Sequence, residues 1–75
     1  MILEKGKYYH QQKMGIREIF KVVKIREESF LGYDIWCSIP EYASGSENDP
    51  WMSKYQDLGE DFYEITQETF PEYFI

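Results

Sequence analysis

The chain has 75 residues, and its 14 acidic and 8 basic side chains give a net charge of −6. A chain of this length buries one hydrophobic core, so residues 1–75 are expected to form a single domain. Because 43% of the residues are hydrophobic and 19% are aromatic, an intrinsically disordered chain is excluded. A pocket of enzymatic size would use up much of so small a core, and we therefore expect a protein that is not an enzyme.

The longest run without a charged residue, 35–40, is far shorter than the ~20 apolar residues of a membrane-spanning helix. We therefore expect no membrane partner. The first residues show no basic region followed by an apolar stretch, so no secretory signal is predicted. Cys37 is the only cysteine, which rules out a disulfide within the chain. These features together predict a cytoplasmic protein.

Charge is distributed unevenly along the chain. Residues 1–28 carry seven basic and four acidic side chains, a net charge of +3, whereas residues 29–75 carry one basic and ten acidic side chains, a net charge of −9. The acidic part repels nucleic acid and attracts a cationic partner. Two interpretations stay open: the basic first part lies against the acidic remainder in the fold, or the acidic side chains form a surface for a basic partner.

Two strands are predicted in the first half of the chain. Residues 17–26 are rich in β-branched side chains, which favours a strand, although a helical spacing of apolar residues is also present. After a polar turn, apolar residues alternate with period two and predict a second strand with these residues on its buried face: Leu31, Tyr33, Ile35, Cys37 and Ile39. An earlier and weaker strand is expected over 7–12.

The second half of the chain allows two folds. Turn-forming residues dominate 40–50, which predicts a mobile loop. Beyond it, either 51–55 and 62–66 are strands that complete a five-stranded barrel, or 51–65 is a helix packed on a hairpin or three-stranded antiparallel sheet. The aromatic and β-branched residues of 62–66 favour the barrel. Thr69 begins a capping-box pattern, so 71–74 is expected to form one helical turn.

The order of these features resembles small SH3-like barrels encoded by bacteriophages and prophages. The resemblance consists of a tyrosine-bearing first strand, a long basic second strand, an alternating third strand, Trp51 after a polar loop, and the ending Phe-Tyr-Glu-Ile-Thr-x-x-x-Phe over 62–70. It implies a mostly β, SH3-like five-stranded barrel with a C-terminal helical turn. It also implies an accessory or host-takeover protein that acts by binding in the host cytoplasm, and it transfers no catalytic residue.

The sequence gives little support for metal, cofactor or nucleophilic chemistry. His10 is the only histidine, so one chain cannot assemble a zinc site with two or more soft ligands, and no cofactor is expected. Cys37 belongs to an apolar stripe, which indicates a core residue rather than a nucleophile. His10 lies in a polar stretch and is expected to be exposed.

The candidate partner surface combines acidic side chains with tyrosines and tryptophans, the residue types that anchor protein interfaces. It comprises Trp36, Tyr42, Trp51, Tyr55, Asp57, Glu60, Asp61, Glu64, Glu68 and Glu72. We expect this acidic surface to occupy a basic site on a partner protein, as an inhibitor that mimics nucleic acid would. Three alternatives remain: a nucleic-acid or nucleotide-binding barrel that uses the basic strand 17–26, a structural subunit of a larger assembly, and an acidic face that serves only solubility.

Overall fold

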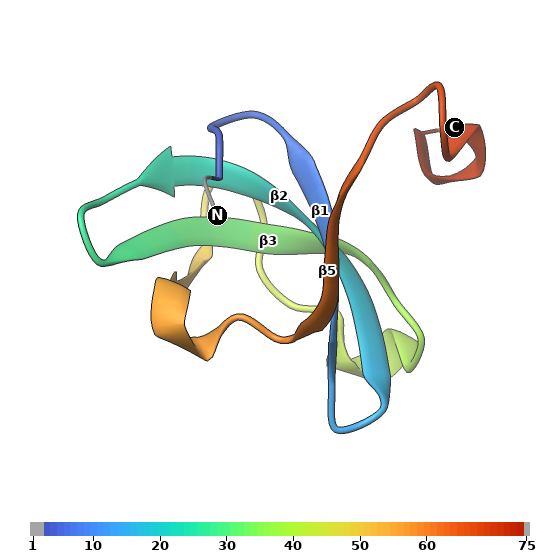
Figure 1. Cartoon of the computed structure of the whole chain (residues 1–75), viewed down its shortest axis with the longest axis horizontal. Helices are drawn as coiled ribbons and strands as arrows, with labels where there is room; N and C mark the ends of the chain where they lie inside the picture. The colour runs from blue at the N-terminus through green and yellow to red at the C-terminus, as the bar shows by residue number, and fades with distance from the viewer. Residues whose placement is uncertain (1–2, 75) are drawn as a thin grey trace.

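Five antiparallel strands form one sheet in the computed structural model, which describes residues 3–74 (Figure 1). The strands are β1 (Tyr8–Lys13), β2 (Ile16–Ile25), β3 (Ser29–Cys37), β4 (Trp51–Lys54) and β5 (Glu60–Ile65). Three short 3-10 helices accompany them, namely η1 (Pro40–Tyr42), η2 (Tyr55–Asp57) and η3 (Pro71–Phe74). None of the helices within residues 3–74 has the length and apolar character needed to cross a membrane.

The strand order in the sheet is β4-β3-β2-β1-β5. The first four strands follow one another as neighbours, and the last strand returns to pair with the first, with Tyr8 opposite Ile65. The mostly β class predicted from the sequence is confirmed. β4 and β5 lie at the two ends of this order and do not pair with each other, so the sheet is open and the barrel is not closed.

The alternative prediction of a helix over 51–65 is wrong. This segment consists of β4, the 3-10 helix η2 and β5. The helix-like spacing of its apolar residues arises because β4, η2, the following loop and β5 each place one side chain against the same core. Four half-buried side chains do this: Trp51, Tyr55, Leu58 and Phe62.

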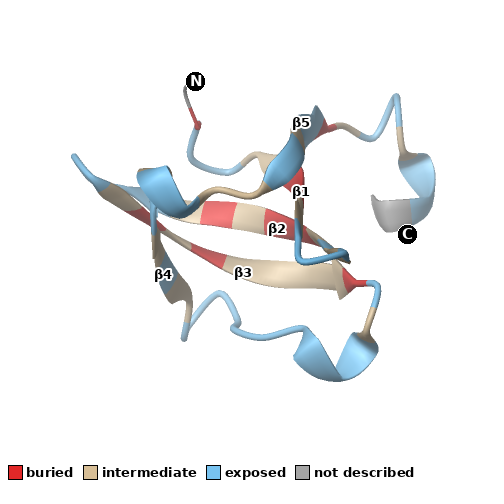
Figure 2. Ribbon diagram, turned by 60° about the horizontal axis from the view of Figure 1, so that its bottom comes forward, coloured by how far each residue is buried: buried red, intermediate tan, exposed pale blue. Residues whose placement is uncertain are grey.

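The core lies on the inner face of the sheet, where aromatic rings from several strands meet. Phe20 of β2 and Phe30 of β3 are fully buried, and their ring centroids are 5.4 Å apart. Tyr9 of β1 stacks on Phe62 at 5.3 Å, and Trp51 meets Phe30 edge-on at 5.7 Å. Figure 2 shows the buried stretches on β1, β2 and β3. Burial of each large apolar side chain contributes about 1.5–3 kcal/mol, so these rings supply most of the driving force for folding.

A β-bulge in β3 reverses the buried face that alternation predicts. Phe20 pairs with Asp34 and Ile19 pairs with Trp36, which leaves Ile35 without an opposite residue. Phe30 therefore enters the core before the bulge, whereas Leu31 and Tyr33 of the predicted stripe are only half-buried. One extra residue shifts the alternation to the other face of a strand. Cys37 follows the bulge and is buried with 6% exposure, which confirms its interpretation as a core residue.

The loop between β3 and β4 contacts the sheet at several points. After η1, Ser46 and Asp49 form an isolated antiparallel bridge within the loop. The Glu47 carboxylate lies 3.8 Å from the Lys21 ammonium group of β2. The mobility of 40–50 stays a prediction, and the Ser44 backbone N–H, which donates to Asp34 Oδ2 at 3.0 Å, places this part of the loop beside β3.

Candidate functional site

The acidic side chains of β5 lie opposite basic side chains from the start of the chain. The Glu64 carboxylate is 3.8 Å from the Lys7 ammonium group, which also contacts Glu4 at 2.6 Å. Asp61 lines a shallow hollow together with Arg17 of β2. In this region the fold therefore brings the basic first part of the chain against the acidic remainder.

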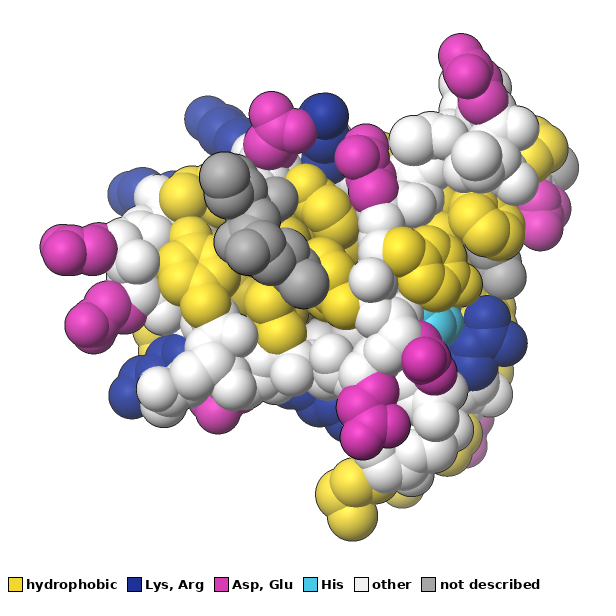
Figure 3. Space-filling model, viewed as in Figure 1, with side chains coloured by type: hydrophobic (Ala, Val, Ile, Leu, Met, Phe, Trp, Pro, Cys, Tyr) yellow, Lys and Arg dark blue, Asp and Glu magenta, His cyan; other side chains and the backbone are white. Residues whose placement is uncertain are grey.

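The other predicted acidic residues are also dispersed. Asp57 and Glu60 line a second hollow that they share with Lys13 at the end of β1. Glu68 and Glu72 are exposed on the segment that leaves the sheet after β5 (Figure 1). Figure 3 shows acidic side chains spread around the rim of one face, with basic side chains among them and hydrophobic ones at the centre. The six acidic residues therefore do not form a single continuous patch.

The four predicted aromatic residues take different positions. Trp51 and Tyr55 are half-buried against the core, and the Tyr55 hydroxyl donates a hydrogen bond of 2.8 Å to the carbonyl of Arg26. Trp36 is half-buried beneath the Arg17 guanidinium group, whose carbon is 5.6 Å from the centre of the indole ring. Tyr42 in η1 is 60% exposed. Tyr42 and Trp51 line one common pocket, and the remaining two lie elsewhere.

That pocket contains two carboxyl groups that sequence analysis did not single out. Glu18 of β2 and Asp34 of β3 both line it, in a volume of about 240 Å³. Gln11 of β1, only 2% exposed, donates a hydrogen bond from Nε2 to Glu18 Oε1 and accepts one of 2.8 Å from the Gly59 backbone N–H. Three neighbouring strands thus each contribute one polar side chain to the inner face of the sheet.

The surroundings of Asp34 favour the protonated form of its carboxyl group. Burial raises the pKa of its carboxyl from the ordinary 3.8 to about 8, and a hydrogen bond to Glu18 and the Glu18 charge add to the shift. The Ser44 backbone N–H opposes it by donating to Asp34 Oδ2 at 3.0 Å. Within residues 3–74, Asp34 Oδ1 is buried and has no hydrogen-bond partner. Two adjacent carboxyl groups avoid repulsion when one of them is protonated.

Aromatic, apolar and polar side chains line the pocket around these two carboxyl groups. The walls include Tyr42, the half-buried Trp51 and Met52, which is 56% exposed. Lys13 also lines the pocket, and within residues 3–74 its ammonium group forms no ion pair. Carboxyl groups in a pocket that Tyr42 and Trp51 help to line are suited to a cation, because the faces of Trp and Tyr rings attract positive charge.

The structure offers no metal centre within residues 3–74, where no group of three or more His, Cys, Asp or Glu side chains is placed to hold an ion. No protein family, curated protein or solved structure matches the chain. The pocket at Glu18 and Asp34 is therefore interpreted from its own geometry.

His10 is buried with 2% exposure, so its predicted exposure is wrong. β1 has a neighbour on each side, with Ile19 of β2 and Tyr63 of β5 opposite His10. Its Nδ1 lies 2.8 Å from the carbonyl oxygen of Asp61, and its Nε2 accepts a hydrogen bond of 3.0 Å from Arg17 Nε. A carbonyl only accepts, so the proton of the neutral ring is on Nδ1. His10 is thus a positioning residue for Arg17 on the outer face of the sheet.

Proposed function

We propose that the protein is a non-enzymatic binding protein whose pocket at Glu18 and Asp34 receives a lysine or arginine side chain of a partner protein. The observation that carries this proposal is the buried Asp34 Oδ1, which has no hydrogen-bond partner within residues 3–74. A cationic side chain replaces the shared proton and gives both carboxyl groups a charged donor. Charge-assisted hydrogen bonds of this kind are the strongest that a protein forms.

The dimensions of the pocket support a side chain as the ligand. About 240 Å³ is below the ~300–1,000 Å³ that small-molecule sites occupy. Carboxyl pairs that share a proton also act as acid and base in hydrolases, but such enzymes need room for a substrate. The small volume therefore favours binding over catalysis.

The proposal keeps a basic partner, as expected from the sequence, and changes the residues that contact it. Tyr42 and Trp51 remain in the contact surface, and Glu18 and Asp34 replace the six predicted acidic residues of 57–72. The resemblance to phage-encoded SH3-like barrels belongs to the same proposal, and the five-stranded antiparallel sheet with η2 between β4 and β5 supports it. If the protein occupied a basic site on a host enzyme in this way, it would inhibit that enzyme.

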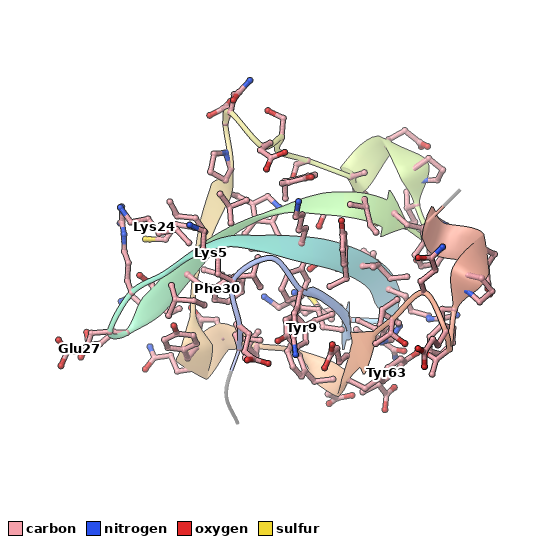
Figure 4. The ribbon with its side chains drawn as sticks, turned by 90° about the horizontal axis from the view of Figure 1, so that it is seen from above. Lys5, Tyr9, Lys24, Glu27, Phe30 and Tyr63 are labelled. Carbon is pink, nitrogen blue, oxygen red and sulfur yellow. The ribbon has the colours of Figure 1, made fainter. Side chains whose placement is uncertain are left out.

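The test uses two capped tripeptides, acetyl-Gly-Arg-Gly-amide and its citrulline analogue, which has nearly the same shape without the charge. Titration of the ¹⁵N-labelled protein should shift the Trp51 indole resonance with the arginine peptide and leave it unchanged with citrulline. Glu18→Gln combined with Asp34→Asn should weaken binding by about tenfold or more. Glu27→Gln is the matched control, because Glu27 lies at the end of the β2–β3 hairpin (Figure 4).

Proton release gives an independent measurement. Because the ligand displaces a proton from the pair, the heat of binding should depend on the ionisation enthalpy of the buffer at pH 7. The affinity should rise between pH 6 and pH 8.5. Equal binding of the citrulline peptide, or an equal loss of affinity in Glu27→Gln, would overturn the proposal.

A further inference from the structure

A second constellation lies on the outer face of the sheet and is centred on Arg17. Its guanidinium group is held from two directions: Nε donates to His10 Nε2 at 3.0 Å, and the guanidinium carbon lies 5.6 Å from the centre of the Trp36 ring. The backbone N–H of Arg17 donates to Ser38 Oγ at 3.0 Å. The guanidinium group of this exposed residue is therefore fixed in orientation, which is unusual for a surface arginine.

The residues that position Arg17 are themselves fixed. His10 is buried, its Nδ1–H donates to the Asp61 carbonyl oxygen at 2.8 Å, and its ring stacks on Tyr63 at 4.6 Å. Tyr63 stacks in turn on Phe70 at 5.9 Å. Planar groups from β3, β2, β1, β5 and the following segment thus form a continuous row across the outer face.

The terminal nitrogens of Arg17 remain available. Within residues 3–74 no carboxylate forms an ion pair with Arg17, although Lys7 pairs with two carboxylates and Lys21 with one. Beside Arg17 lies an open hollow of about 450 Å³, lined by His10, Gln12, Arg17, Asp61, Phe62 and Tyr63. Tyr63 is 38% exposed there.

We infer that this hollow binds a carboxylate of an acidic peptide, with an apolar side chain of the same peptide against Tyr63. The two terminal nitrogens of a guanidinium group match the two oxygens of a carboxylate. Arg, Trp and Tyr are the residue types that contribute most to protein interfaces, and here all three are adjacent. A single unpaired cation suits one carboxylate, whereas nucleic acid requires several basic side chains without acidic neighbours.

The site is independent of the pocket at Asp34, and separate resonances report on it. The probes are acetyl-Glu-Phe-amide and acetyl-Gln-Phe-amide, titrated into the ¹⁵N-labelled protein while the Arg17 Nε–H and Trp36 indole signals are followed. The glutamate peptide should shift both signals to saturation, and the glutamine peptide should bind about tenfold more weakly or not at all.

Three variants test the role of each group. Arg17→Lys keeps the charge but loses the two terminal nitrogens of the guanidinium group and the Nε–H that contacts His10. We therefore expect affinity for the glutamate peptide to fall about tenfold. Asp61→Asn removes the carboxylate that shares the hollow, so affinity should rise by a few-fold. Lys24→Gln changes the charge at the opposite end of the molecule from Tyr63 (Figure 4) and should leave affinity unchanged.

Several results would overturn the inference. The first is that the glutamate peptide shifts neither signal, and the second is that Lys24→Gln loses as much affinity for this peptide as Arg17→Lys does. The third is that an oligothymidylate shifts the same signals more strongly at equal ionic strength, which would assign the site to nucleic acid. If the spectrum of Arg17→Lys shows that this variant does not fold, the Asp61→Asn variant provides the test. Unchanged or weaker binding of the glutamate peptide by Asp61→Asn would contradict a carboxylate ligand.

Discussion

Asp34 and Ser44 exchange two hydrogen bonds. The Ser44 N–H donates to Asp34 Oδ2 at 3.0 Å, and the Asp34 N–H donates to the Ser44 carbonyl at 2.9 Å. This pair of hydrogen bonds holds the loop after η1 against β3, beside the half-buried carboxyl groups of Glu18 and Asp34. The proton on Asp34 therefore influences both the pocket and the loop that borders it.

The raised pKa of Asp34 makes stability depend on pH. The unfolded chain loses this proton near pH 3.8, whereas the folded protein keeps it until about pH 8. The folded state therefore binds more protons in this window, and its stability falls as the pH rises from about 4 to 8. Glu18, Lys13 and Tyr42 are the other titratable groups that line the pocket.

Asp34→Asn should remove this dependence, because an amide donates to Glu18 without having to ionise. At pH 8 we expect the variant to be more stable than the parent by about 1–3 kcal/mol, a range that allows for solvent screening of the half-exposed side chain. Urea midpoints at pH 5, 7 and 9 provide the measurement, with Glu27→Gln as the control. Parallel pH curves for parent and variant would contradict the assignment.

Phe20 has the largest expected effect on stability. It is fully buried and contacts Tyr9, Phe30, Trp51 and Phe62 through its ring. Phe20→Ala should cost about 3–5 kcal/mol, which approaches the whole stability of a domain this small. Far-UV circular dichroism on heating should show a largely unfolded variant. Phe20→Leu should fold with a lowered melting temperature, and Met14→Ser, at a fully exposed turn position, should melt like the parent.

Gly59 allows the loop before β5 to approach β1 closely. A Cβ atom on this residue would lie 2.5 Å from the backbone carbonyl oxygen of Gln12, which cannot move aside without disturbing the sheet. Gly59→Ala should therefore destabilise the protein by about 1–3 kcal/mol in urea unfolding. Gln56→Ala, at an exposed position of η2, should change stability by less than about 0.5 kcal/mol. Equal effects of the two substitutions would refute the close approach.

The thiol of Cys37 reports on opening of the fold. Because it is only 6% exposed, a thiol reagent such as dithiobis-nitrobenzoate should react with it in the native protein at least about a hundredfold more slowly than in urea. The control is Cys37→Ala combined with Ser46→Cys, which places a thiol on the exposed loop. That thiol should react rapidly without denaturant, and similar rates for the two proteins would mean that Cys37 is accessible.

The sequence predicts the strands well because the residues that form them favour one conformation locally. The β-branched stretch of 17–26 and the alternation of 31–39 correspond to β2 and β3. The buried face of β3 could not be predicted, because the bulge at Ile35 is set by pairing with β2 and not by the alternation itself. His10 was misassigned for a similar reason, since its burial depends on pairing with β5, more than fifty residues later.

The candidate site was missed because its polar residues come from separate strands. Gln11, Glu18 and Asp34 become adjacent only through the strand register, with Gln11 opposite Glu18. One signal was present in the sequence: Glu18 shares the alternation of Phe20 and Val22, which places a carboxylate on the buried face of β2. The acidic residues of β5 were selected from their number in the sequence, whereas in the fold Glu64 lies 3.8 Å from Lys7, which precedes β1.

The return of β5 to β1 determines when the fold can form. On the ribosome, β1 emerges early, yet its second neighbour exists only after the ribosome has added residue 65. Contacts between such distant parts of a chain slow folding, and an incomplete chain leaves the rings of its early strands uncovered. Nascent chains that stall before β5 should therefore be sensitive to proteases and bound by chaperones, and folding should be completed only after β5 has been synthesised.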